Sequence, residues 1–396
     1  MKNLYHMPIG GILSEKKRKR AALAVFIPLC LAVAVLVLIL SLQSAFTGTG
    51  ETISVSNLPD LRKALEDPGD RSIILTESIA TDNIIEVKSG VKTVTAESSG
   101  ISLTGGGAYG TIQVNSGAEL IIGRDSSETL TFTNAGGYVF HVNGSLTMNG
   151  GTIKDSTGGD GGAVHIEPNG HFTLNHGTIS GSGKSNAYGG AVHVAINGRF
   201  TMNDGTISDN QALVGGAVYV KGEFTMNGGT IDANTASAQG GGIYIDKGKI
   251  TLYAGALINN TATEGSGYGG AAPAPTVENT VYNAVIAANH ASVTGGGLWS
   301  CPSGTVVIDE KSAVFCGNRA GVSGAGLCIE SGNVPVIPAQ MLGGANEEWY
   351  WDMAGNRYPS EETLFENGVY PPNYDSCGIT LTNTVQATAT TLDELK

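Results

Sequence analysis

Six ring-bearing side chains recur at one position of a sequence repeat, and they are the residues best suited to chemistry or binding. Each lies between two apolar or small residues, and they follow one another at steps of 24, 28, 26, 25 and 55 residues: His141, His165, His193, Tyr219, Tyr244 and Trp299. On a strand the flanking residues would point inward and the rings outward. A row of outward rings could stack on the sugars of a polysaccharide, or it could stabilise the sheet by packing across strands.

Carboxylates that could form an acid and base pair are sparse and lie at expected turns. Inverting glycoside hydrolysis needs two carboxyl groups about 6.5–9.5 Å apart, which neighbouring repeats could supply as Asp209 with Asp232, or Asp155 with Asp160. Aspartates at turns, however, usually cap the backbone and face solvent. The chain also lacks an HExxH motif and a CxxC pair, the common patterns of zinc sites. The sequence therefore predicts no catalytic residue, no metal site and no cofactor.

Asparagine occupies a second regular position. Five of these residues follow one another at steps of 24, 26, 29 and 29: Asn210, Asn234, Asn260, Asn289 and Asn318. If successive repeats stack about 4.8 Å apart, each amide can bond to its neighbours and to backbone groups of the turn. We expect a structural ladder at this position and not a catalytic site.

The repeat itself determines how these residues are positioned. Its best copies begin with paired glycines at Gly161, Gly189, Gly215 and Gly240. Each copy holds three short apolar blocks bounded by Gly, Asn or Asp, which predicts three strands and no helix. Strands that stack on their equivalents form parallel sheets, and parallel crossovers are right-handed in about 98% of cases. The sequence thus predicts an all-β fold, a right-handed parallel β-helix solenoid. We expect the 55-residue step to span two coils, and we expect a core stack of Phe172, Phe200 and Phe224.

The glycine and phenylalanine motifs resemble those of a known group. Gly-Gly-Ala-Val stands at 161–164, 189–192 and 215–218, and Phe-x-x-Asn recurs, for example at Phe172 and Phe200. Over about residues 136–330 the pattern is similar to the repeats of chlamydial polymorphic membrane proteins and, more broadly, of pectin-lyase-like β-helix surface proteins of bacteria. The resemblance implies a surface-displayed adhesin or binding protein. It leaves a polysaccharide lyase or glycoside hydrolase as the alternative, although the hydrolase motifs Asn-Thr-Asp, Gly-His-Gly and Arg-Ile-Lys are absent.

The N-terminal segment predicts a membrane span. Residues 1–20 carry six basic residues and one acid, and residues 21–42 are almost purely apolar. A run of 22 residues is long enough to cross a bilayer as a helix. The positive-inside rule then keeps the basic tail in the cytoplasm and sends the repeats outside. We predict an uncleaved signal anchor, with a cleaved signal peptide as the alternative. Because the chain ends without autotransporter barrel strands, we expect display to depend on this segment.

Composition limits the partners. The 396-residue chain has a net charge of −13, and beyond the basic tail the charge is −18, which disfavours nucleic acid. The expected partners are a polysaccharide, or a surface protein of a host or neighbouring cell, and the membrane through residues 21–42. We expect a basic cytoplasmic tail at 1–20, the anchor at 21–46, a linker and capping helix at 47–70, the β-helix at 71–339, and a C-terminal cap and tail at 340–396.

Overall fold

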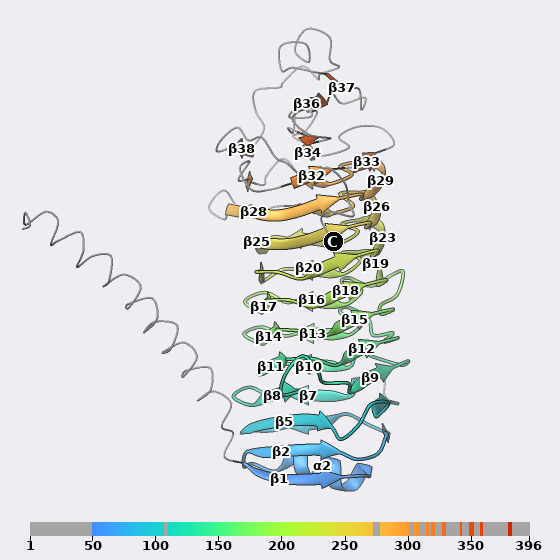
Figure 1. Cartoon of the computed structure of the whole chain (residues 1–396), viewed down its shortest axis with the longest axis vertical. Helices are drawn as coiled ribbons and strands as arrows, with labels where there is room; N and C mark the ends of the chain where they lie inside the picture. Colours follow the sequence, from blue (N-terminus) through green and yellow to red (C-terminus); the bar gives the residue numbers. More distant parts are fainter. Residues whose placement is uncertain are drawn as a thin grey trace, which may run out of the picture. The chain divides into compact units, whose positions relative to one another are not determined.

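The computed structural model describes residues 50–106, 110–271 and 278–300, together with short strands further along the chain. These residues belong to one compact unit, Gly50–Lys396. Within them the chain is an all-β parallel solenoid, and the one helix among the described residues is α2 (Leu58–Glu66). Strands of successive coils stack on one another along the solenoid (Figure 1), as the repeat pattern predicts.

The ring-bearing residues lie in a ten-stranded parallel sheet to which each coil contributes one short strand. In chain order its strands are β4 (Ile85–Val87), β7 (Ile112–Val114), β10 (Phe140–Val142), β13 (Val164–Ile166), β16 (Val192–Val194), β20 (Val218–Val220), β24 (Ile243–Asp246), β27 (Tyr268–Ala271), β30 (Leu298–Ser300) and β34 (Leu327–Ile329). The register pairs Tyr244 with Gly269, and β27 in turn pairs with β30. The 55-residue step from Tyr244 to Trp299 therefore spans two coils, as predicted.

A twenty-stranded sheet takes two strands from most coils. One series consists of β1 (Glu51–Val55), β2 (Arg71–Leu75), β5 (Val91–Ala96), β8 (Glu119–Ile122), β11 (Ser145–Met148), β14 (His171–Leu174), β17 (Arg199–Met202), β21 (Glu223–Met226), β25 (Lys249–Ile258), β28 (Glu278–Ala287), β31 (Thr305–Ile308) and β38 (Ile379–Leu381). The other consists of β3 (Ile79–Thr81), β6 (Ser102–Gly105), β9 (Thr131–Asn134), β12 (Thr152–Lys154), β15 (Thr178–Ser180), β18 (Thr206–Ser208), β22 (Thr230–Asp232) and β32 (Val314–Cys316). Strands β25 and β28 run through both series and join them. In β25, Tyr253 and Ala254 replace the Asn227-Gly228 corner of the preceding coil, so the strand continues where that coil turns.

Two smaller sheets complete the described strands. A five-stranded parallel sheet begins at β19 (Gln211–Val214) and continues with β23 (Thr235–Gln239), β26 (Thr261–Glu264), β29 (His290–Thr294) and β33 (Arg319–Ala320). Further along, β35 (Met341–Leu342), β36 (Glu348–Trp351) and β37 (Arg357–Tyr358) pair antiparallel. The antiparallel strands lie in the segment predicted to be the C-terminal cap.

The solenoid begins earlier than residue 71, the start expected from the sequence. Strand β1 precedes α2 and pairs in parallel with β2, with Ile53 opposite Ile73. The segment from Thr52 to Val55 alternates polar and apolar residues, which suits a strand. The predicted linker at 47–70 thus contains the first strand as well as the helix.

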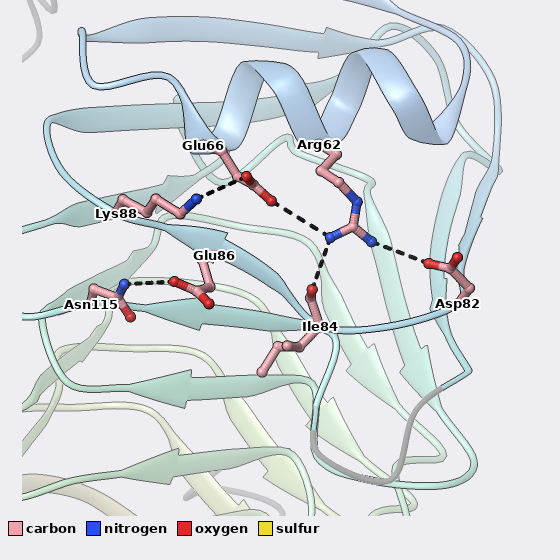
Figure 2. A network of polar contacts seen from close by, with 7 residues as sticks. All are labelled: Arg62, Glu66, Asp82, Ile84, Glu86, Lys88 and Asn115. Carbon is pink, nitrogen blue, oxygen red and sulfur yellow. Dashed lines mark hydrogen bonds and ion pairs between the residues drawn. The ribbon is translucent and has the colours of Figure 1, made fainter.

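Helix α2 covers the N-terminal end of the core. Its N-cap is Asn57, whose side chain accepts a 3.0 Å hydrogen bond from the Asp60 amide. Leu61 and Leu65 are fully buried against the first coils. Figure 2 shows Arg62 of this helix donating hydrogen bonds to the Ile84 carbonyl oxygen and to Asp82, each at 3.1 Å. The helix therefore closes the open end of the solenoid, as a capping element must.

The core contains the predicted phenylalanine stack. The ring centroids of Phe172 and Phe200 lie 5.0 Å apart, those of Phe200 and Phe224 lie 4.8 Å apart, and both pairs are nearly parallel. All three side chains are almost fully buried. This stack fixes the register of successive coils and therefore the alignment of the residues on the outer face.

Candidate functional site

The five asparagines form a buried ladder. Four hydrogen bonds of 2.9–3.0 Å, each from Nδ2 of one member to Oδ1 of the next, join Asn210, Asn234, Asn260, Asn289 and Asn318. The amides also donate to backbone carbonyls, for example Asn234 to Ile207 at 2.9 Å. All five residues are buried. They hold the turns together and are not accessible to a ligand.

The rings of the ten-stranded sheet stack on one another along the solenoid. We call His141, His165, His193, Tyr219 and Tyr244 the ring ladder. Centroids of successive rings lie 5.7, 4.7, 5.3 and 5.7 Å apart, and the last three pairs are within 15° of parallel. The flanking residues, such as Val192 and Val218, are in the core, so the rings lie on the outer face as expected. Trp299 lies in β30, two coils beyond Tyr244, but its side chain is outside the described part of the chain.

The ring ladder is closely packed, which bears on the two roles that the sequence leaves open for it, a binding platform or stabilisation of the sheet. A sugar stacks on the face of a ring, and here the faces from His165 to Tyr244 cover one another. The ladder is also overlaid, because Tyr138 lies 5.5 Å from His141 and Tyr188 lies 5.1 Å from Tyr219. His193 and Tyr219 are only 7% and 5% exposed. This packing favours the alternative role, in which the rings stabilise the sheet.

Glycines of the repeat motif allow the chain to pass close to the ladder. Gly189 has a φ of 74°, and a Cβ there would lie 2.2 Å from the Val192 carbonyl oxygen and 3.2 Å from Cβ of Tyr219. A side chain would be excluded by both contacts and by the left-handed backbone. The Gly-Gly motif therefore serves the close packing over the ladder and does not itself indicate a ligand.

Burial is the main cause of the pKa shifts of His193 and Tyr219 in the ladder. Burial, with further contributions from His165 and Lys221, lowers the pKa of His193 to about 3, and its Nδ1 atom has no hydrogen-bond partner among the described residues. Burial also raises the pKa of Tyr219, whose hydroxyl donates to Asp246 at 2.6 Å. At neutral pH both side chains are uncharged, as stacked rings inside a packed layer require.

A groove opens beside the ladder because one turn is shorter than its neighbours. Four residues separate Val194 from Arg199, whereas only two separate Val220 from Glu223. Lys221 and Gly222 of this short turn line a groove with a volume of about 890 Å³. Four successive turns contribute its lining: Asn169, His171, Ile196, Asn197, Arg199, Lys221, Gly222, Glu223, Asp246, Lys247, Gly248 and Lys249. We call this the basic groove.

Two of the groove's cations are paired and two are not. The Arg199 Nε atom lies 3.3 Å from Glu223, and Lys221 Nζ lies 3.6 Å from Asp246. Lys247 and Lys249 are exposed, and no acidic group of the described residues lies within ion-pair distance of them. The groove thus presents two free ammonium groups to solvent.

Of the aspartates considered for acid and base roles, Asp155, Asp160 and Asp209 are turn residues, and Asp232 is the last residue of β22. Asp155 and Asp209 have φ values of 53° and 56°, the left-handed conformation that Asp tolerates at corners. The Asp209 amide donates to the Asp232 carbonyl oxygen at 3.2 Å, and Asp160 Oδ1 accepts from the Tyr188 amide at 3.0 Å. Their observed contacts are therefore those of corner residues.

Comparison with known proteins adds no relationship: no protein-family model, no curated protein and no solved structure matches the chain. Among the residues that the structure describes, no helix is long and apolar enough to span a membrane, and the predicted span at 21–42 lies outside them. The described residues also contain no group of three or more His, Cys, Asp or Glu side chains that could hold a metal ion.

Proposed function

We propose that this protein is a surface-displayed, right-handed parallel β-helix that binds polysaccharide through the basic groove and acts as an adhesin. In this proposal residues 21–42 anchor the chain in the cell membrane, with the basic tail in the cytoplasm and the solenoid outside. A surface protein of a host or neighbouring cell is a second kind of partner that the displayed solenoid would bind.

The observation that carries the proposal is the extent of the basic groove. Its lining comes from four successive coils, which at about 4.8 Å per coil corresponds to roughly 14 Å along the solenoid. A groove that crosses several coils suits an extended ligand better than a compact one. Because the walls are rigid stacked turns, the ligand would meet a preformed surface.

The groove's side chains match the chemistry of sugars. Asn169 and Asn197 offer amide donors and acceptors for hydroxyl groups. Glu223 and Asp246 offer carboxylate acceptors. Ile196 is 61% exposed at the groove wall and offers an apolar contact for the face of a sugar ring. Few apolar groups and several directed polar groups are what an open carbohydrate site needs.

The membrane part of the proposal is supported by the sequence. The basic cluster from Lys16 to Arg20 directly precedes the apolar run, and this order keeps the N-terminus inside. Protease treatment of intact cells tests the orientation: residues beyond 50 should be cleaved, and the basic tail should be protected.

Binding is tested by retention of the full chain, in detergent, on a panel of immobilised polysaccharides, with released oligosaccharides assayed in the same wells. Retention without release supports the proposal, whereas release would indicate the lyase or hydrolase alternative. Ile196→Ala should weaken retention, because it removes the exposed apolar contact. Tyr253→Ala is the matched control, since Tyr253 is 49% exposed but lies outside the groove.

A further inference from the structure

We infer that the basic groove selects anionic polysaccharides, whose carboxylate or sulfate groups pair with Lys247 and Lys249. The inference rests on the proposed function, because it names the class of polysaccharide that the same groove would bind. The groove's local positive charge and the conformation of Lys247 point to an anionic ligand, and its other polar side chains point to a sugar polymer.

The local charge of the groove opposes that of the chain. Acidic residues outnumber Lys and Arg by 35 to 22 in the whole chain, but the groove is lined by four Lys and Arg side chains and two acids. The two acids are already matched by Arg199 and Lys221. Lys247 and Lys249 therefore supply the groove's uncompensated positive charge. On an acidic body such a patch attracts an anion locally while the surroundings repel it.

Lys247 has a backbone conformation that two earlier turns of the groove give to asparagine. Each of the three residues directly precedes a glycine, and their φ values are 61° for Lys247, 67° for Asn169 and 62° for Asn197. Asparagine tolerates this left-handed conformation better than lysine does. Strain retained at a surface position is a sign of function when the surrounding structure does not require the residue. The ammonium group of Lys247 has no acidic partner among the described residues, so a ligand is the partner that would account for it.

The remaining side chains favour a sugar polymer over other polyanions. A nucleic acid carries a charge on every backbone unit and would be repelled by Glu223, by Asp246 and by the acidic surface beyond the groove. A polysaccharide carries hydroxyl groups between its charges. Those hydroxyls can donate to the two carboxylates while the anionic groups accept from the lysines. Coils spaced about 4.8 Å apart repeat at a distance comparable with the length of one sugar unit.

Three forms of one polymer test the inference: dextran, carboxymethyl-dextran and dextran sulfate share a backbone and differ in charge. Affinity of the full chain in detergent should be higher for both charged forms than for dextran. The difference should shrink as sodium chloride is raised, because salt screens exposed charges within about 8 Å at 0.15 M. Equal affinity for all three forms, or equal binding of single-stranded DNA and carboxymethyl-dextran, would overturn the inference.

The decisive variant is Lys247→Asn combined with Lys249→Gln. The first change introduces the residue type that has this conformation at Asn169 and Asn197, so the fold should be at least as stable by thermal unfolding. Affinity for the charged dextrans should fall about fivefold or more, as expected when two exposed ion pairs are lost, with dextran unaffected. Lys154→Gln combined with Lys184→Gln is the control, since both lysines are exposed outside the groove and the net charge changes equally.

The outcomes separate the inference from the proposed function. If both double variants lose affinity equally, total charge and not the groove attracts the polymer, and the inference is wrong. If the wild-type chain is retained by neutral polysaccharides of the panel as well as by charged ones, the inference fails and the proposed function stands. If no polysaccharide of either experiment is retained, the proposed function itself fails.

Discussion

The hydroxyl of Tyr219 donates a 2.6 Å hydrogen bond to Oδ2 of Asp246, one coil further along the solenoid. The same carboxylate oxygen lies 3.6 Å from Lys221 Nζ, and that ammonium group lies 5.5 Å from the centroid of the Tyr219 ring. Asp246 therefore contacts the ring ladder through Tyr219 and also lines the basic groove. This shared residue couples the packed layer of rings to the open site beside it.

Tyr219→Phe tests this coupling. The change keeps the ring between His193 and Tyr244 but removes the donor to Asp246. We expect a loss of about 1–2 kcal/mol in the free energy of unfolding, as for one hydrogen bond to a charged group, measured by urea denaturation. Tyr253→Phe is the control, because Tyr253 stacks on Tyr282 at 5.3 Å but is largely exposed. Equal effects of the two substitutions would contradict the role of the Asp246 contact.

Stability should depend on pH through His193. Its pKa is lowered from 6.5 to about 3 in the fold, chiefly by burial and then by His165 and Lys221. Below pH 6.5 the unfolded chain takes up a proton that the folded chain does not. Stability should therefore fall as the pH drops from about 6.5 towards 3 and should level off below that, by a few kcal/mol at about 1.4 kcal/mol per pKa unit.

The variant His193→Phe isolates this contribution. Phenylalanine can stack between His165 and Tyr219 and does not titrate, and the Nδ1 atom that it removes has no partner in the part of the chain that the structure describes. The midpoint of thermal unfolding should decline less steeply between pH 6.5 and 4 than in the wild type. Parallel pH profiles for the two proteins would show that other groups cause the acid sensitivity.

The solenoid was predictable because the same residue types recur at the same positions in successive coils. The asparagine, phenylalanine and ring positions recur at a nearly constant step, and parallel stacking pairs each residue with its equivalent, so Phe172 meets Phe200 and Asn210 meets Asn234. Periodicity alone thus determines the register. The two-coil step from Tyr244 to Trp299 followed from the same reasoning.

The exposure of the rings was not predictable from periodicity. Alternation places His193 and Tyr219 on the outer face, but it carries no information on what lies over that face. Tyr188 comes from a segment outside the strands and packs on Tyr219, a tertiary contact without a sequence pattern. The basic groove did have a signal, namely the short turn between Val220 and Glu223 and the lysine at an asparagine position. Comparing turn lengths between repeats would have found it.

The buried asparagine ladder should contribute more to stability than an exposed one. Asn234 donates to Asn260 and Ile207 and accepts from Asn210, all within the core. Asn234→Ala leaves the Asn210 amide groups without this acceptor, so we expect a loss of about 2–4 kcal/mol in the free energy of unfolding.

A second ladder supplies the matched control. Asn203 donates to Asn175 at 2.7 Å and accepts from Asn227 at 2.7 Å, but Asn203 is exposed. Asn203→Ala should cost less than about 1 kcal/mol, because water replaces the lost bonds. Urea denaturation of both variants makes the comparison. A cost as large at Asn203 as at Asn234 would show that stacking of the amides, and not burial, determines the ladder's contribution.

The capping helix should depend on Arg62. Its guanidinium group reaches the Ile84 carbonyl oxygen and Asp82 and lies 3.6 Å from Glu66, which in turn accepts from Lys88 (Figure 2). Arg62→Ala removes the group that joins these residues to the helix. We expect a loss of about 1 kcal/mol and faster amide hydrogen exchange in α2 than in β7 or β10.

Lys63→Ala is the control, since Lys63 lies on the same helix and is exposed. Alanine at either position should raise helix propensity slightly. Faster amide hydrogen exchange in α2 that occurs only in Arg62→Ala would therefore result from the lost contacts of Arg62. Because an uncovered solenoid end exposes unpaired strand edges and apolar core, this variant should also aggregate faster on mild heating, as followed by light scattering. Equal exchange and equal scattering in the two variants would mean that burial of Leu61 and Leu65 alone holds the helix in place.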